Sequence, residues 1–256
     1  MAFGDILQTD SAAIPNTDTV STVSVTLGEA ITEGSLLLTF HFTGDANSIG
    51  PGTFSEAFAL TNATETDEGA LYYKIAGSSE STTITCTSDS DDEQYLLVLE
   101  VEGAWNAAPF DKTAETGRTT ATESISTNTT AETSQADELA AAMVIQRTKD
   151  LTNSWTNSFV NRGDITNAGE VGWYKTMGCA TKLLSSAAAI ESTASWSGAT
   201  TALAGVGTFM AAAGGDPAVS ESDDLTIGES IGADLTIGVG IKMDGAGYQG
   251  TGVKVL

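Results

Sequence analysis

The stretch VSTVSVTL, residues 20–27, decides the fold class, because apolar and polar residues alternate along most of it. A period of two places Val23, Val25 and Leu27 on one face of an extended strand. The stretch SLLLTFHFT, residues 35–43, is apolar at successive positions in its first part, which is typical of a strand buried on both faces. Gly28 and Gly34 separate the two stretches. Together they predict antiparallel β structure.

Similar strand-like segments follow in both halves of the chain. In the first half they are residues 56–62, 70–76, 82–87 and 94–102. In the second half they are residues 139–146, 153–160, 170–177, 190–197 and 202–212. The two series have the same order, and we align Tyr73 with Tyr174, an offset of 174 − 73 = 101 residues. The pattern predicts an all-β, antiparallel two-sheet β-sandwich of the jelly-roll type over residues 1–213, with similar halves at about 20–103 and 119–213.

Two segments carry weaker signals. Residues 104–135 are rich in Thr and Ser and hold no strong apolar run. We expect an edge strand near residues 119–128, together with loops that cross between the halves. Residues 181–188 fit either the only helix or a strand that continues from Gly178.

The formal net charge is −24, with 10 basic against 34 acidic residues. Phosphate binding needs clustered Lys or Arg, and the basic residues are scattered along the chain. We therefore expect neither nucleic acid nor an anionic membrane as a partner, and we interpret the charge as a source of solubility. Residues 1–5 lack a basic segment before a long apolar run, so we expect no signal peptide and folding in a cytoplasm.

Residues suited to catalysis are scarce. His41 is the only histidine and lies in an apolar strand, where packing is the expected role. The chain shows no nucleophile elbow, no phosphate-binding loop and no histidine spacing for a metal. Glu100 and Glu102 alternate with apolar residues and are expected on a solvated face. We therefore expect no catalytic residue, and we interpret Cys86 and Cys179 as buried free thiols.

Two weaker ligand sites are considered. Asp89, Asp91 and Asp92 belong to an acidic loop, and such oxygen-rich loops bind Ca²⁺, although a solvated loop is the favoured interpretation. No other cofactor is expected. Trp105 and Trp155 lie in polar segments and are candidates for stacking on a sugar, with packing as the favoured alternative.

Residues 214–256 differ from the rest, because the motif DLTIG occurs at 224–228 and again at 234–238. The apolar residues expected to make assembly contacts are Leu225, Ile227, Leu235, Ile237, Val253, Val255 and Leu256. Leaving these side chains in water would be costly. We expect a C-terminal extended β arm that docks on a second copy of the chain, and the alternative is that it closes the edge of its own sandwich.

Five short segments carry a resemblance to a known family. They are residues 1–8 (MAFGDILQ), 34–38 (GSLLL), 72–74 (YYK), 136–139 (ADEL) and 173–175 (WYK). Over residues 1–213 the chain resembles phage and virus structural proteins with concanavalin-like or jelly-roll sandwiches, which serve in capsid decoration, head fibres or tails. The resemblance carries no catalytic residues across.

The resemblance implies a virion structural protein of a tailed virus, as a capsid decoration (cement) or head-fibre component. Its implied partners are further copies of itself, the major capsid protein and other virion proteins, and its location is the virion after assembly in the host cytoplasm. A homo-oligomer is expected, with a trimer favoured by the habit of jelly-roll virion proteins. The alternative is a carbohydrate-binding module that recognises a receptor from a viral fibre or tail.

Overall fold

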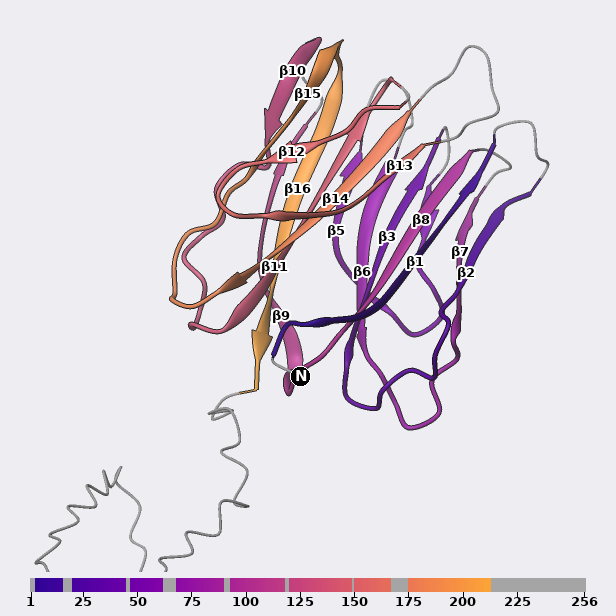
Figure 1. Ribbon diagram of the computed structural model, residues 1–256, viewed down its shortest axis with the longest axis vertical. Coiled ribbons are helices and arrows are strands. Elements are labelled where there is room, and N and C mark those ends of the chain that lie inside the picture. The colour runs from indigo at the N-terminus through magenta and orange to yellow at the C-terminus, as the bar shows by residue number, and fades with distance from the viewer. Residues whose placement is uncertain are drawn as a thin grey trace, which may run out of the picture. The chain divides into compact units, whose positions relative to one another are not determined.

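A computed structural model describes residues 3–15, 20–44, 47–61, 68–89, 93–117, 120–148, 150–166 and 175–212 (Figure 1). The expected arm, residues 214–256, lies outside this part of the chain. Residues 1–218 form a compact unit of their own.

The described residues form sixteen strands and no helix, which confirms the all-β prediction. The first eight strands are β1 (Ile6–Ile14), β2 (Thr22–Thr26), β3 (Leu36–Thr43), β4 (Ser48–Ile49), β5 (Ser55–Thr61), β6 (Glu68–Ile75), β7 (Thr83–Ser88) and β8 (Gln94–Val101). The next eight are β9 (Trp105–Thr116), β10 (Thr122–Ser126), β11 (Glu138–Gln146), β12 (Ser154–Trp155), β13 (Val160–Thr166), β14 (Thr176–Leu184), β15 (Thr193–Thr200) and β16 (Ala202–Ala211).

The sheet topology is a duplication. The first half forms a five-stranded sheet in the order β1-β8-β3-β6-β5 and a three-stranded sheet in the order β2-β7-β4. The second half repeats both orders with every strand number raised by eight, as β9-β16-β11-β14-β13 and β10-β15-β12. Pairing of the first strand with the last, and alternation of strands between two sheets, is the jelly-roll arrangement. The prediction of two similar halves is therefore confirmed.

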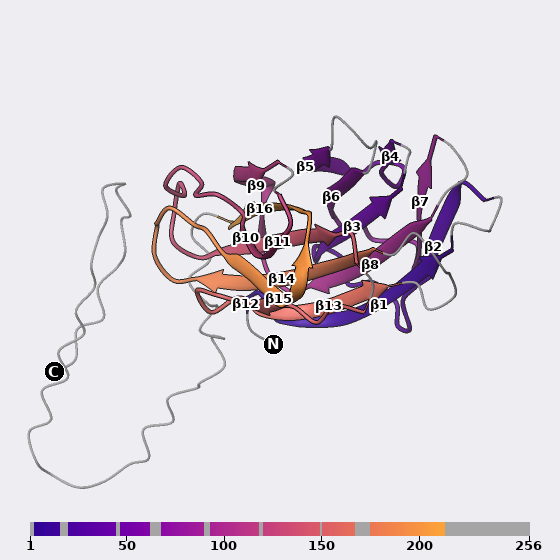
Figure 2. The ribbon, with the colours of Figure 1, turned by 90° about the horizontal axis from the view of Figure 1, so that it is seen from above.

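The four sheets are stacked in four layers (Figures 1 and 2). Leu38 and Phe40 of β3 share one buried cluster with Leu139 and Met143 of β11, so the two five-stranded sheets face each other. The alternate residue Leu37 belongs to a second cluster, shared with the small sheet of its own half. The two large sheets make the predicted sandwich, and each has a three-stranded sheet on its outer face. This stacking buries β3, β8 and β11 along their whole length, as expected for residues 35–43.

The halves begin earlier than the sequence indicates, at β1 and β9 rather than near residues 20 and 119. β9 was not foreseen because its alternation is irregular: it contains Pro109, and its pairing with β16 shifts register between Gly207 and Phe209. The expected edge strand at 119–128 is β10, which lies at the edge of its sheet. Residues 181–184 continue strand β14, so the strand alternative is the observed one.

The alignment of the two aromatic–lysine segments is wrong. Gln146 of β11 faces Thr176, as Thr43 of β3 faces Glu68, so β6 and β14 are related by 176 − 68 = 108 residues rather than 101. Lys175 therefore precedes β14, whereas Lys74 lies inside β6; residues 170–174 are outside the described part. The predicted strand 153–160 is also wrong, because the counterpart of β5 is β13, which begins at Val160.

A buried ion pair joins the two halves. The Nζ atom of Lys175, next to β14, lies 2.7 Å from Oε1 of Glu93, next to β8, and their side chains are 5% and 1% exposed. The Tyr95 hydroxyl donates to the other Glu93 oxygen at 2.9 Å. The ammonium also lies 5.2 Å from the centroid of the Phe42 ring. Both charges are thus held by partners across the junction of the halves.

Candidate functional site

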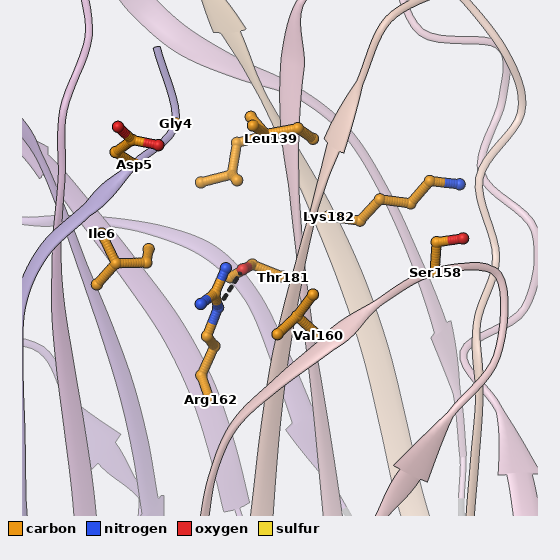
Figure 3. A pocket seen from close by; sticks show the side chains of 10 residues that line it. Gly4, Asp5, Ile6, Leu139, Ser158, Val160, Arg162, Thr181 and Lys182 are labelled. Carbon is orange, nitrogen blue, oxygen red and sulfur yellow. Dashed lines mark hydrogen bonds between the residues drawn. The ribbon is translucent and has the colours of Figure 1, made fainter. Parts of the chain in front are cut away.

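A pocket of about 520 Å³ lies where the start of the chain meets β13 and β14 (Figure 3). Arg162 and Lys182 bring two cations to it, and Ser158 and Thr181 bring hydroxyl groups. Its aliphatic lining consists of Ile6, Leu139, Val160 and Leu183, and Asp5 is the one acidic side chain among the lining residues. The pocket therefore combines positive charge, hydrogen-bonding groups and apolar surface.

Arg162 owes its position to an irregularity in β13. The pairing of β13 with β14 shifts register between Asn161 and Gly163, which makes Arg162 the extra residue of a β-bulge. Bulges redirect a side chain relative to the regular pleat. The Nε–H group of Arg162 donates to the Thr181 hydroxyl at 2.7 Å, as the dashed line in Figure 3 shows. Burial lowers the pKa of Arg162, but a guanidinium remains charged in proteins.

Gly4 lets the start of the chain close one side of this pocket. Its φ angle is +84°, and its N–H donates to the Glu102 carbonyl at 2.8 Å. A Cβ atom added at this position would collide with the side chain of Leu183. The backbone conformation therefore favours glycine, and any larger residue would also displace the Leu183 side chain.

The apolar lining is partly open to solvent. Val160 is 52% exposed and Leu183 is 47% exposed. In the part of the chain that the structure describes, the other large exposed hydrophobic residues are Val20 and Ile49. Half of these exposed side chains thus meet at one pocket, beside two cations.

The candidate sugar-stacking residues do not form a site together. Trp105 is buried in β9; its ring lies 4.6 Å from that of Phe3, and its Nε1–H donates to the Val101 carbonyl at 3.3 Å. The stacking hypothesis is therefore wrong for Trp105, which packs. Trp155 is half-buried in β12 and packs against the clusters beneath its sheet. Sugar binding at Trp155 stays a prediction.

The candidate calcium loop is only partly described. Asp89 accepts hydrogen bonds from the backbone N–H of Asn47 at 2.9 Å and from its side-chain amide, which lowers the pKa of Asp89. Asp91 and Asp92 lie outside the described residues, as do all seven candidate assembly residues of the arm. Among the described residues, no group of three or more His, Cys, Asp or Glu side chains is placed to hold a metal ion.

Two further expectations have opposite outcomes. Cys86 and Cys179 are buried free thiols, as predicted. Glu100 is not solvated: it is 1% exposed, and its carboxylate accepts hydrogen bonds from the N–H of Thr32 at 2.7 Å and from the amide of Gln8 at 2.5 Å. The alternation places Glu100 on the outer face of the five-stranded sheet of the first half, and the three-stranded sheet of that half covers this face.

His41 forms a buried polar network in β3. Its Nε2 lies 3.2 Å from Oε1 of Gln94, whose own amide donates to the Val20 carbonyl, so the imidazole proton belongs on Nε2. Nδ1 then accepts from the Ser48 hydroxyl at 2.7 Å. Burial lowers the pKa of His41 to about 4, against a smaller opposite effect of the Gln94 hydrogen bond. So weak a base is poorly matched to activating Ser48 near neutral pH.

Because His41 is the only histidine, its titration can be followed without ambiguity. We expect a midpoint near pH 4 in the folded protein, measured by ¹⁵N-resolved NMR of the imidazole. Because the folded pKa of His41 lies below the unfolded value of about 6.5, the stability that the buried neutral ring contributes is fully present above pH 6.5. This contribution is lost as the pH falls through 4. The urea-unfolded chain is the control, and a folded midpoint near 6.5 would contradict the buried neutral ring.

A second buried titratable group lies at the start of β11. Glu138 is fully buried and accepts from the backbone N–H of Gln135 at 3.3 Å. Burial raises the pKa of Glu138 to about 7; a hydrogen bond from Thr208 opposes this effect and the charge of Asp111 adds to it. Asp111 itself is paired with Lys112 at 2.7 Å. The Glu138 carboxyl therefore binds a proton more readily in the folded state.

The expected consequence is a pH-dependent penalty that Glu138→Gln removes. Since the folded pKa of Glu138 is above the unfolded one, the stability that its protonated carboxyl contributes is fully present below pH 4.5. This contribution is lost as the pH rises through 7. We expect the free energy of unfolding of E138Q, compared with that of the wild type, to rise by on the order of 1 kcal/mol between pH 4.5 and pH 8. Urea unfolding at the two pH values measures it. Glu132→Gln, at an exposed position, is the control. Parallel pH profiles for E138Q and the wild type would refute the assignment.

Sequence reasoning missed Arg162 and Lys182 because it placed the strand boundary of β13 seven residues early. With that boundary shifted, nothing indicates that the two cations lie on adjacent strands. The available signal was that basic residues are scarce, since only ten occur in the chain.

Within the described ranges, no helix is long and apolar enough to cross a membrane.

Comparison with known protein families, with curated proteins and with solved structures finds no match for this chain.

Proposed function

We propose that the chain is a structural protein of a virus particle, one that works through its surfaces rather than through a catalytic centre. The observation that carries the proposal is the duplicated jelly roll, whose two large sheets are stacked face to face and covered on both outer sides. Such a body is stiff, because its central strands are buried on both faces. It offers loops, sheet edges and outer sheet faces for contact with other proteins.

The chemistry of the described residues agrees with this role. Several buried polar side chains are engaged in internal networks, such as His41 with Ser48 and Glu93 with Lys175. The net charge of −24 favours protein partners over nucleic acid or anionic membranes. Capsid decoration or a head fibre of a tailed virus is the proposed place in the particle. The proposed partners are further copies of the chain, through residues 220–256, and other virion proteins.

Immunoelectron microscopy tests the proposal directly. Antibodies raised against the full-length chain are expected to label purified virus particles, and the labelled position distinguishes head, fibre and tail. Pre-absorption of the antibodies with the pure protein is the control. A chain that is abundant in infected cells but absent from purified particles would contradict the proposal.

A further inference from the structure

We propose that the pocket between the start of the chain, β13 and β14 receives part of the acidic, aliphatic segment 224–237 of a second copy of the chain. The inference rests on the self-assembly in the proposed function and names the surface that performs it. Its structural basis is that Arg162, Lys182 and the exposed side chains of Val160 and Leu183 line one pocket.

The cations of this pocket are suited to carboxylates. Thr181 uses the Nε–H of Arg162, which is one of five donors of the guanidinium. In Figure 3 the end of the Arg162 side chain points into the space between Ile6 and Thr181. A planar guanidinium can bind both oxygens of one carboxylate, and Lys182 adds a second positive charge on the neighbouring strand. Two of the ten basic residues in a chain of charge −24 thus line one pocket, with Arg162 ending beside Thr181 and Lys182 pointing toward Ser158 in Figure 3.

The apolar part of the pocket needs an aliphatic partner. Val160 and Leu183 are about half exposed, and the buried side chain of Leu139 also lines the pocket. Exposed aliphatic surface in a concave, charged setting favours a ligand that brings both aliphatic side chains and negative charge. Nucleic acid meets the second requirement but not the first.

Segment 224–237 has both properties in its sequence. The stretch DLTI occurs at 224–227 and again at 234–237, so a carboxylate precedes two aliphatic side chains twice. Between residues 220 and 239 the acidic residues are Glu221, Asp223, Asp224, Glu229 and Asp234, with no Lys or Arg. In an extended strand, residues two apart share one face, so Leu225 and Ile227 can enter an apolar site together. Charge and apolar pattern thus match the pocket.

A charge-swap experiment on the full-length chain tests this assignment. Sedimentation velocity is measured over a range of concentrations for the wild type, for R162E/K182E, and for D224K/D234K. We expect the wild type to self-associate and each variant to associate at least tenfold more weakly. An equimolar mixture of the two variants is expected to associate again, because each supplies the complement of the other. R162Q/K182Q provides a milder version of the pocket change.

The controls separate the possible outcomes. Ser24→Glu with Thr26→Glu makes the exposed face of β2 more acidic and is expected to associate like the wild type. A monomeric wild type, or a pocket variant that associates normally, would overturn the proposal. Restoration in the quadruple variant R162E/K182E/D224K/D234K without restoration in the mixture would place the contact within one chain, and it would overturn the second-copy assignment. Particle labelling is independent of all these results, so failure of the pocket leaves the virion proposal separately testable.

Discussion

Replacing Lys175 by Met is expected to destabilise the protein by roughly 3–5 kcal/mol, because it leaves the carboxylate of Glu93 buried without its cation. Met preserves the length and apolar stem of Lys, so the change removes the charge with little loss of packing. The hydrogen bond from the Tyr95 hydroxyl to Glu93 does not replace the positive charge of Lys175. The double variant E93Q/K175M, which removes both charges, is expected to recover much of the loss.

The matched control is Lys74→Met. Lys74 also lies 2.7 Å from a glutamate, Glu80, but its side chain is 25% exposed. Solvent screens such a pair, and its loss is expected to cost at most about 1 kcal/mol. Urea unfolding at pH 7 compares the two variants. Equal losses would mean that the Lys175 pair is no more important than a surface pair.

Much of the fold is predictable because two simple patterns mark its strands: alternation marks β2 of a three-stranded sheet, and a continuous apolar run marks β3 of a five-stranded sheet. Residues 20–27 contain β2, and residues 35–43 contain β3, within two residues at either end. The outer face of each large sheet was harder to interpret. A period of two assigns Glu100 and His41 to a face, but it does not say that another layer covers that face. Both residues are buried and hydrogen-bonded, whereas the alternation alone predicts that Glu100 faces solvent.

The candidate site was less accessible to sequence reasoning, because it depends on contacts between distant segments. Trp105 is buried by Phe3, which lies about a hundred residues earlier in the chain and belongs to the other half. The pocket needs the same N-terminal segment against Leu183, together with a bulge that displaces Arg162. Local composition predicts neither contact, since both follow from how the halves pack.

That packing predicts that the two halves unfold together. Phe58 of β5 is 3% exposed and lies in the cluster shared by both large sheets. A Cβ atom added to Gly205 of β16 would lie 2.9 Å from its ring, so the ring fills space that the glycine leaves open. Phe58→Ala is expected to cost about 3–5 kcal/mol through the cavity that remains.

Tryptophan fluorescence can show whether this loss reaches the second half. All four tryptophans, at positions 105, 155, 173 and 196, lie after β8, whereas Phe58 belongs to the first half. Because one cluster spans both halves, F58A is expected to shift the fluorescence and far-ultraviolet circular dichroism midpoints in urea by the same amount. Phe54→Ala, at the edge of the outer cluster of the first half, is the control and should cause a smaller loss. If F58A splits the unfolding curve and leaves the fluorescence midpoint in place, the halves are independent domains, and their shared core contributes little to stability.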